Sequence, residues 1–295
     1  MKLCLGTVQF GMEYGIRKFG QPTRADALEM LEFAINNDVC AIDTASVYGT
    51  AEIVVGEFIK NNPNVRNKIE IISKLSPNAL EGERSEYYFT KIQECINQSL
   101  NNLHIDYLDV YLLHNPDYLF NDKAITELIN LKNTGLTKKV GVSVYTPDEA
   151  IRGIECGLDI LQIPYSIFDQ RMDEQGIFEL ATKKNIELHS RSAFTQGLML
   201  MDESDIPSSL KEMQSIIRKY SDFCEKEKLS RVEIALAFVC RHSCIKKLVF
   251  GVDNIIQLSE IINAYNKPVH QSVLDEASKI FAGINEKLVS PVKWN

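Results

Sequence analysis

The feature that most restricts the fold of this chain is a repeated alternation of short apolar runs with longer segments of helical periodicity. Such alternation predicts a parallel sheet, because each helix returns the chain to the same end of the sheet. We predict strands at residues 3–7, near 41, 69–74, 108–114, 139–144, 160–164, 186–190 and 247–251. Eight parallel strands with helices between them predict an α/β fold, a closed (β/α)8 TIM barrel.

Side chains that cap helices mark several of the predicted helix starts. Thr23 and Asp26 suit the start of the first helix, and Thr146 is followed by Pro147 in the first helical position. Ser230 begins the capping-box sequence SRVE directly before another apolar helical pattern. These local signals place helices where the alternation requires them.

The segment before the eighth predicted strand is the longest and holds two helical patterns, at residues 210–228 and from Ser230 onward. Eight βα units need only one helix there, so we predict one extra helix outside the barrel before strand eight. The residues after Tyr265 predict a short helix and a C-terminal tail. Because a barrel of this type needs roughly 250 residues, we predict a single domain over residues 1–295.

Three of the predicted strands end near ionisable side chains. Asp43 ends one strand and is followed five residues later by Tyr48, Lys74 ends the next, and His114 ends the one after. The carboxyl ends of barrel strands converge on one face, so we expect the four groups to share a pocket. There a Lys74 ammonium would lower the pKa of Tyr48, Asp43 would keep the buried lysine charged, and a neutral His114 would orient a substrate oxygen. Four such groups are sufficient to protonate a carbonyl oxygen.

On these motifs the sequence resembles the aldo-keto reductases, whose Asp, Tyr, Lys and His tetrad appears here as DTASVYG, ISK and LLHNP. The resemblance covers about residues 1 to 265. It implies an NAD(P)H-dependent oxidoreductase that reduces an aldehyde or ketone by hydride transfer, with Tyr48 as general acid. The implied catalytic residues are Asp43, Tyr48, Lys74 and His114.

The expected substrate pocket is formed by Tyr14, Tyr48, His114 and Asn115. Tyr14 belongs to a glycine-punctuated loop after the first strand, which is a candidate pocket wall. Asn115 stands where many family members have Trp, which implies a more polar or roomier pocket. We therefore expect a small-molecule carbonyl substrate, with sugar-like compounds as candidates.

The resemblance also implies a dinucleotide site at the remaining strand ends. Ser143 and Gln162 match positions that hydrogen-bond the nicotinamide carboxamide, Arg191 matches the position that stacks on the ring, and Ser192 matches a pyrophosphate contact. The full set of implied cofactor-binding residues is Gly6, Thr7, Asp43, Ser143, Gln162, Arg191, Ser192, Gly251, Val252 and Gln257.

The choice between NADPH and NADH depends on the segment after the eighth strand. A helix that begins near Asn254 would offer backbone N–H groups to a phosphate. However, residues 248–266 contain no basic side chain for a 2′-phosphate and do contain Asp253. Because the family that this sequence resembles commonly uses NADPH, we expect NADPH as the cofactor, with NADH as the alternative.

Two other functions remain open at this point. A barrel aldolase would use Lys74 to form a Schiff base with its substrate. A binding protein would use the same fold as a non-catalytic nicotinamide sensor, because a fold does not dictate an activity.

The charge of the chain restricts its partners. A formal net charge of -8 argues against a nucleic-acid or anionic-membrane partner. The sequence shows neither a signal peptide nor a membrane-spanning stretch, so we expect a cytoplasmic protein.

We predict no metal site, because the only Cys and His cluster, at residues 240–244, lacks a second pair of ligands. Trp294 in the tail is expected to dock either at the substrate pocket or against the outer helices.

Overall fold

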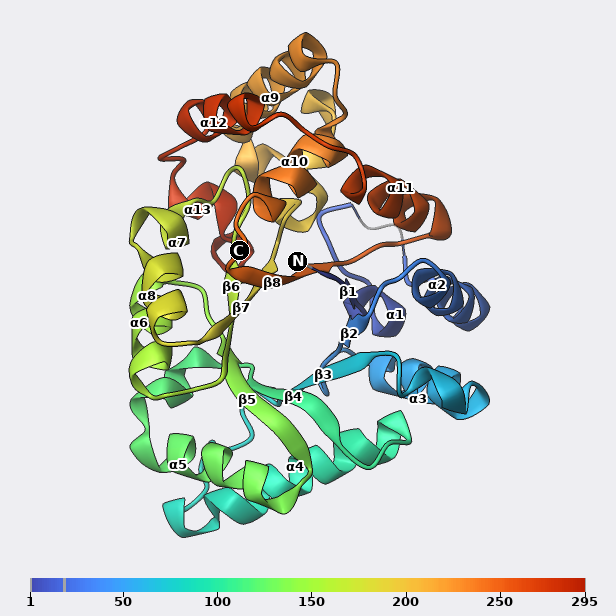
Figure 1. Ribbon diagram of the computed structural model, residues 1–295, viewed down its shortest axis with the longest axis vertical. Coiled ribbons are helices and arrows are strands. Elements are labelled where there is room, and N and C mark those ends of the chain that lie inside the picture. Colours follow the sequence, from blue (N-terminus) through green and yellow to red (C-terminus); the bar gives the residue numbers. More distant parts are fainter. Residues whose placement is uncertain (1, 18–19, 295) are drawn as a thin grey trace.

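The computed structural model describes residues 2–17 and 20–294 and contains a closed barrel of parallel strands, each paired with its neighbours in chain order. β8 closes the ring by pairing with β1. The strands are β1 (Lys2–Gly6), β2 (Ala41–Asp43), β3 (Glu70–Leu75), β4 (Leu108–Leu113), β5 (Thr137–Ser143), β6 (Ile160–Pro164), β7 (Glu187–Arg191) and β8 (Ile245–Phe250). Figure 1 shows the strands as a ring surrounded by helices, so the predicted (β/α)8 barrel is confirmed.

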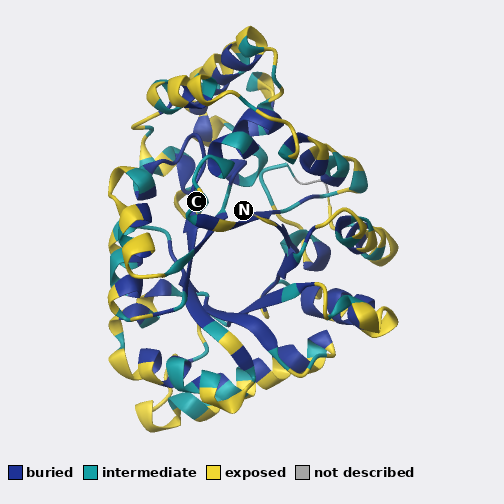
Figure 2. Cartoon of the chain, in the orientation of Figure 1, coloured by how far each residue is buried: buried dark blue, intermediate teal, exposed yellow. Residues whose placement is uncertain are grey.

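Helices cover the outside of the ring, and their inner faces are buried whereas their outer faces are exposed (Figure 2). The helices are α1 (Val8–Gly11), α2 (Arg24–Asn36), α3 (Ala51–Asn61), α4 (Tyr88–Leu103), α5 (Asp122–Asn130), α6 (Pro147–Glu155), α7 (Arg171–Glu174), α8 (Ile177–Lys183), α9 (Met213–Glu227), α10 (Arg231–Cys240), α11 (Ile255–Tyr265), α12 (Gln271–Ile280) and α13 (Glu286–Val289). Capping boxes at Thr23, Thr146 and Ser230 begin α2, α6 and α10, as the sequence predicts.

The extra helix before the eighth strand is confirmed, because both α9 and α10 lie between β7 and β8. α9 lies at the periphery beside α12 (Figure 1), and an ion pair of 2.8 Å joins Lys226 of α9 to Glu276 of α12. After α12 the tail continues through α13 and a short turn at Pro291–Lys293. No helix in the described part of the chain is long and apolar enough to span a bilayer.

Two strands begin two residues earlier than predicted. β5 starts at Thr137 and β8 at Ile245, and in both the second and third residues are lysines. The lysines interrupt the apolar pattern that marks the strands in the sequence. The structure accommodates them because Lys139 and Lys247 form ion pairs with acidic residues of other strands.

Those ion pairs belong to a polar cluster near the N-terminal ends of the strands, opposite the expected site. Glu187 is its centre: it pairs with Lys139 at 2.6 Å, with Lys247 at 3.4 Å and with the His189 ring at 2.9 Å. Lys247 also pairs with Glu70 at 2.9 Å. His189 is fully buried, and this burial lowers the pKa of its imidazole. The cluster therefore holds a neutral histidine beside paired charges at neutral pH.

Candidate active site

The ends of β2 and β3 place Asp43 and Lys74 in direct contact. Lys74 Nζ donates to Asp43 Oδ1 at 2.5 Å and to the Thr44 carbonyl at 2.9 Å. The Lys74 side chain is only 1% exposed. From β6, Gln162 Nε2 donates to the second Asp43 oxygen at 2.7 Å. The carboxylate is thus held on both oxygens, and the lysine has the counter-ion that a buried ammonium requires.

Two glycines position Tyr48 above this pair. A Cβ added to Gly11 would lie 1.7 Å from the Tyr48 carbonyl oxygen. Only a glycine at this position therefore lets the short helix α1 pack so closely against the loop that carries Tyr48. Gly49 adopts a φ of 55° and faces the Gly11 carbonyl at a distance that also excludes a Cβ. The Tyr48 ring consequently lies with its centroid 5.0 Å from Lys74 Nζ and 5.7 Å from the His114 ring, edge to face.

The protonation states suit a proton donor beside a cation. Burial raises the pKa of Tyr48, and although Lys74 acts to lower it, the net direction is upward. The lowered Tyr48 pKa that the sequence predicts is therefore wrong for this structure, because desolvation outweighs the ammonium. Burial acts to lower the pKa of Lys74, but Asp43 and Tyr48 raise it overall, so the lysine is charged. Burial, Lys74 and Arg191 lower the pKa of His114 to about 3, so its imidazole is neutral.

A cavity of about 590 Å³ opens above these groups, between the loops that follow the strands. Twelve of the residues predicted from the sequence line it: Gly6, Thr7, Tyr14, Asp43, Tyr48, His114, Ser143, Gln162, Arg191, Ser192, Gly251 and Gln257. The structure thus brings most of the predicted catalytic and cofactor residues to one cavity. Lys74 lies beneath it, covered by Asp43 and Tyr48.

Besides Lys74, two of the predicted site residues do not line the cavity. Asn115 turns away from it, because its Oδ1 accepts from the Asp117 N–H at 3.0 Å and its amide donates to the Pro77 carbonyl at 3.4 Å. Val252 is buried in the hydrophobic core. Asn115 and Val252 each lie two residues after a strand end, but the local turn directs their side chains elsewhere.

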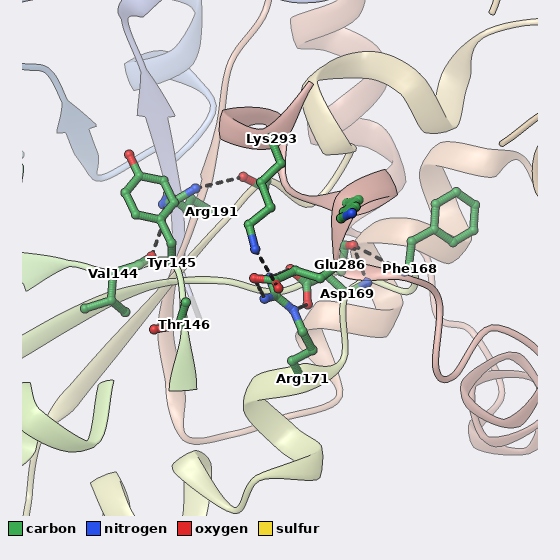
Figure 3. A network of polar contacts seen from close by, with 12 residues as sticks. Val144, Tyr145, Thr146, Phe168, Asp169, Arg171, Arg191, Glu286 and Lys293 are labelled. Atoms are coloured by element: carbon green, nitrogen blue, oxygen red, sulfur yellow. Dashed lines mark hydrogen bonds and ion pairs between the residues drawn. The ribbon is translucent and has the colours of Figure 1, made fainter. Parts of the chain in front are cut away.

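Arg191 makes contacts that the sequence did not indicate. Its guanidinium lies over the Tyr145 ring, 4.6 Å from the centroid, and Nη2 donates to the Val144 carbonyl at 2.8 Å (Figure 3). Nη1 lies 3.3 Å from Ser192 Oγ. Tyr145 itself lines the cavity. Its position two residues after Ser143, at a strand end, is the signal that would have identified it.

The C-terminal tail forms part of the cavity wall through Pro291 and Val292. Behind them Lys293 pairs with Glu286 at 2.7 Å, and Glu286 pairs with Arg171. Arg171 in turn holds Asp169 through two bonds of 2.8 Å, so ion pairs connect the tail to the loop after β6 (Figure 3).

Trp294 does not line the cavity. It packs against the main hydrophobic core instead. The sequence left open whether Trp294 docks at the pocket or against the outer helices. The tail reaches the pocket through Pro291 and Val292, but Trp294 itself does not.

The lining fits a polar ligand such as a dinucleotide. Gln9 Oε1, His114 Nδ1 and Arg191 Nε are buried and have no hydrogen-bond partner in the described part of the chain. A Cβ at Gly251 would lie 2.6 Å from Gln9 Oε1, so the Gln9 amide packs directly against the Gly251 backbone at this wall. Unsatisfied polar atoms at a cavity wall indicate a ligand that satisfies them.

The N-terminus of α11 is less available to a phosphate than the sequence suggests. Asn254 Oδ1 accepts from the Gln257 N–H at 3.0 Å, and Gln257 Oε1 accepts from the Asp253 N–H at 2.8 Å. The chain thus uses the amide groups of Asp253 and Gln257 itself, leaving those of Asn254, Ile255 and Ile256.

We expect acid to destabilise the fold through its buried histidines. The folded-state pKa values of His114 and His189 are both lowered, so below pH of about 6.5 the unfolded chain binds protons that the folded chain does not. Each should contribute a slope of up to about 1.4 kcal/mol per pH unit. Urea unfolding between pH 7.5 and 5 measures this dependence. His189→Gln should remove the contribution of one histidine to the slope of the unfolding free energy with pH. A free energy of unfolding that does not change with pH across this range would contradict the lowered pKa values of the two histidines.

Comparisons with known proteins agree with this geometry. The model of the Aldo/keto reductase family matches residues 2–281. An uncharacterized oxidoreductase, YcsN of Bacillus subtilis (strain 168), is 26% identical over 278 residues, which cover 88% of both chains. The NADH-specific methylglyoxal reductase of Escherichia coli (strain K12) is 24% identical over 76% of this chain and 78% of its own. The holo form of the aldo-keto reductase AKR11C1 from Bacillus halodurans shares the fold, with a TM-score of 0.78 and 19% identity over 100% of this chain and 95% of its own.

Proposed function

The chain belongs to the aldo/keto reductase family of NAD(P)H-dependent carbonyl reductases, and from this premise we propose that it reduces an aldehyde or ketone with Tyr48 as the proton donor. The observation that carries the proposal is the convergence of Tyr48, Lys74, Asp43 and His114 at one end of the cavity. A panel of aldehydes and ketones, assayed by oxidation of NADH and NADPH, tests it. Absence of turnover with every carbonyl would contradict it.

In the proposed reaction the Tyr48 hydroxyl gives its proton to the carbonyl oxygen as that oxygen becomes negative. Lys74 stabilises the resulting phenolate, and Asp43 keeps the lysine charged throughout. The neutral His114 donates a hydrogen bond that orients the substrate oxygen. When bound, the reduced nicotinamide supplies the hydride.

Several lining residues suit the carboxamide end of a nicotinamide. Gln162 donates its amide to Asp43, which leaves its carbonyl oxygen to accept from the carboxamide N–H. Ser143 ends the neighbouring strand β5 and pairs in register with Gln162. We propose Gly6, Thr7, Ser192, Gly251 and Gln257 as further cofactor contacts, because each lines the same cavity.

The environment of Lys74 opposes a Schiff-base aldolase. A lysine nucleophile must be neutral and accessible, whereas Lys74 is buried beneath the cavity and its charge is stabilised by Asp43. Borohydride trapping would distinguish the two reactions, and we expect no adduct on Lys74. A nicotinamide sensor would bind dinucleotide but turn over no carbonyl, so the same panel separates it from a reductase.

We propose that the preference between NADPH and NADH is small, although the family habit favours NADPH. Between β8 and the end of α11, the described residues that line the cavity include the carboxylates Asp253 and Glu260. They include no lysine or arginine. A charge-assisted hydrogen bond to the 2′-phosphate, worth about 1.5 to 3 kcal/mol, is therefore missing from this wall. The relative in E. coli is named as an NADH-specific reductase, which is consistent with a cofactor site that lacks a basic partner for the 2′-phosphate.

Fluorescence titration with the two dinucleotides should accordingly give dissociation constants within about tenfold of each other. Asp253→Lys should strengthen NADPH binding and leave NADH nearly unaffected, because only NADPH carries the extra phosphate. Asp275→Lys on α12, outside the cavity, is the matched charge control. A wild-type preference of a hundredfold or more for NADPH would show that a basic residue elsewhere binds the 2′-phosphate.

A further inference from the structure

Arg191 places a positive charge in the cavity that no carboxylate of the described residues neutralises. Its partners among the described residues are neutral: the Val144 carbonyl, Ser192 Oγ and the Tyr145 ring. A guanidinium has five N–H donors, and only two of them are used in these bonds. Because half-buried charges are normally paired, a free cation at a cavity wall indicates an anionic ligand.

The position of Arg191 is at the catalytic end of the cavity. It ends β7, pairs in register with Pro164 of β6, and contacts Val144 and Tyr145, which directly follow Ser143. Its charge contributes to the lowered pKa of His114, so its field reaches the histidine proposed to orient the carbonyl. A group bound to Arg191 would therefore lie close to the reacting carbonyl.

The other charged groups of the cavity do not compensate for Arg191. Asp43 is neutralised by Lys74, and Arg17 pairs with Asp205 at 2.9 Å. Asp253 follows the neighbouring strand β8 and Glu260 lies on α11, and neither carboxylate forms an ion pair or hydrogen bond with Arg191 in the described part of the chain. The catalytic end is thus cationic although the whole chain carries a formal net charge of -8.

We propose that the substrate is a carbonyl compound that also carries a carboxylate, such as an oxo acid, a semialdehyde or an acidic sugar, and that Arg191 binds this carboxylate. The proposal rests on the proposed carbonyl reduction. In that reaction a C–H bond forms at the carbonyl carbon, the C=O π bond breaks, and the oxygen takes the proton of Tyr48. Reduced nicotinamide is oxidised, and the substrate carboxylate is unchanged, so Arg191 acts only in binding and positioning.

Matched pairs of substrates test the proposal. Glyoxylate and glyoxylamide differ in an anion next to the carbonyl, whereas 4-carboxybenzaldehyde and 4-carbamoylbenzaldehyde differ in a distant one. For at least one pair we expect kcat/KM to favour the acid by roughly 10- to 150-fold, the range of a charge-assisted hydrogen bond. Arg191→Met should remove this preference, and Arg191→Lys should retain part of it, since lysine keeps the charge but loses the planar donor geometry.

Arg218→Gln is the control, because Arg218 is exposed on α9 and pairs with Glu203 away from the cavity. It should leave the preference for acids unchanged. Equal kcat/KM values within both pairs would overturn the proposal. So would an equal loss for acid and amide in Arg191→Met together with weaker dinucleotide binding, because this would place Arg191 on the cofactor.

A binding measurement keeps the inference separate from the proposed function and does not depend on the variants. Calorimetry with the protein saturated with oxidised dinucleotide should show benzoate binding at least tenfold more tightly than benzamide. Equal binding of the two would overturn the anion site even if carbonyl reduction is confirmed. Tighter benzoate binding without turnover of any carbonyl would retain the anion site and refute the reductase.

Discussion

Tyr48→Phe is expected to abolish practical carbonyl reduction while leaving the dinucleotide affinity within a few-fold of wild type. The substitution removes the only proton that the proposed mechanism gives to the carbonyl oxygen, and general acid catalysis contributes roughly 10²- to 10⁴-fold to a rate. It removes little volume, and the ring can keep its contacts with Lys74 and His114. Single-turnover rates with saturating reduced dinucleotide measure the chemical step directly.

Tyr14→Phe is the comparison for this result. Tyr14 also lines the cavity, and its hydroxyl accepts from Gln196 Nε2 at 2.8 Å, outside the Asp43–Lys74 network. Its loss should change KM more than kcat. If Tyr48→Phe kept most of the wild-type rate, or if the two variants lost kcat equally, Tyr48 would not be the acid.

Lys74→Met should damage both activity and stability. The change leaves the Asp43 carboxylate buried without its cation, which costs about 3 to 5 kcal/mol when one partner of a buried pair is removed. Among the described residues, only the amide of Gln162 would remain as a donor to this carboxylate. The rate should fall as well, because no positive charge would stabilise the Tyr48 phenolate. Chemical denaturation and steady-state kinetics measure the two effects separately.

The double variant Asp43→Asn/Lys74→Met separates the charge of Asp43 from the loss of the lysine side chain. Removing both charges should recover much of the lost stability, because the unpaired carboxylate is gone. Activity should not return, since the phenolate would still lack its cation. A folded Lys74→Met protein with wild-type rates would show that the lysine has no catalytic role.

Local sequence patterns were sufficient to predict the barrel and the convergence of Asp43, Tyr48, Lys74 and His114. The run before Asp43 and those that end in Lys74 and His114 predict buried parallel strands, whose carboxyl ends must meet on one face. The caps at Thr146 and Ser230 likewise involve residues three positions apart, so neighbours in the chain suffice to predict them.

Local patterns did not predict which side chains near the strand ends face the cavity. Asn115 turns toward the Pro77 carbonyl and Val252 enters the core, whereas Tyr145 faces the cavity and supports Arg191. The approach of the C-terminal tail through Val292 could not be predicted either. These placements depend on contacts between segments far apart in the chain, which local periodicity does not specify.

The pKa of Tyr48 depends on tertiary structure for the same reason. The sequence indicated the nearby ammonium, which lowers that pKa, but not the extent of burial, which raises it further than Lys74 lowers it. Burial is produced jointly by the loops that enclose the cavity, and desolvation depends on all the atoms that exclude water. Sequence patterns therefore predict which ionisable groups converge, whereas their protonation follows from the packing around them.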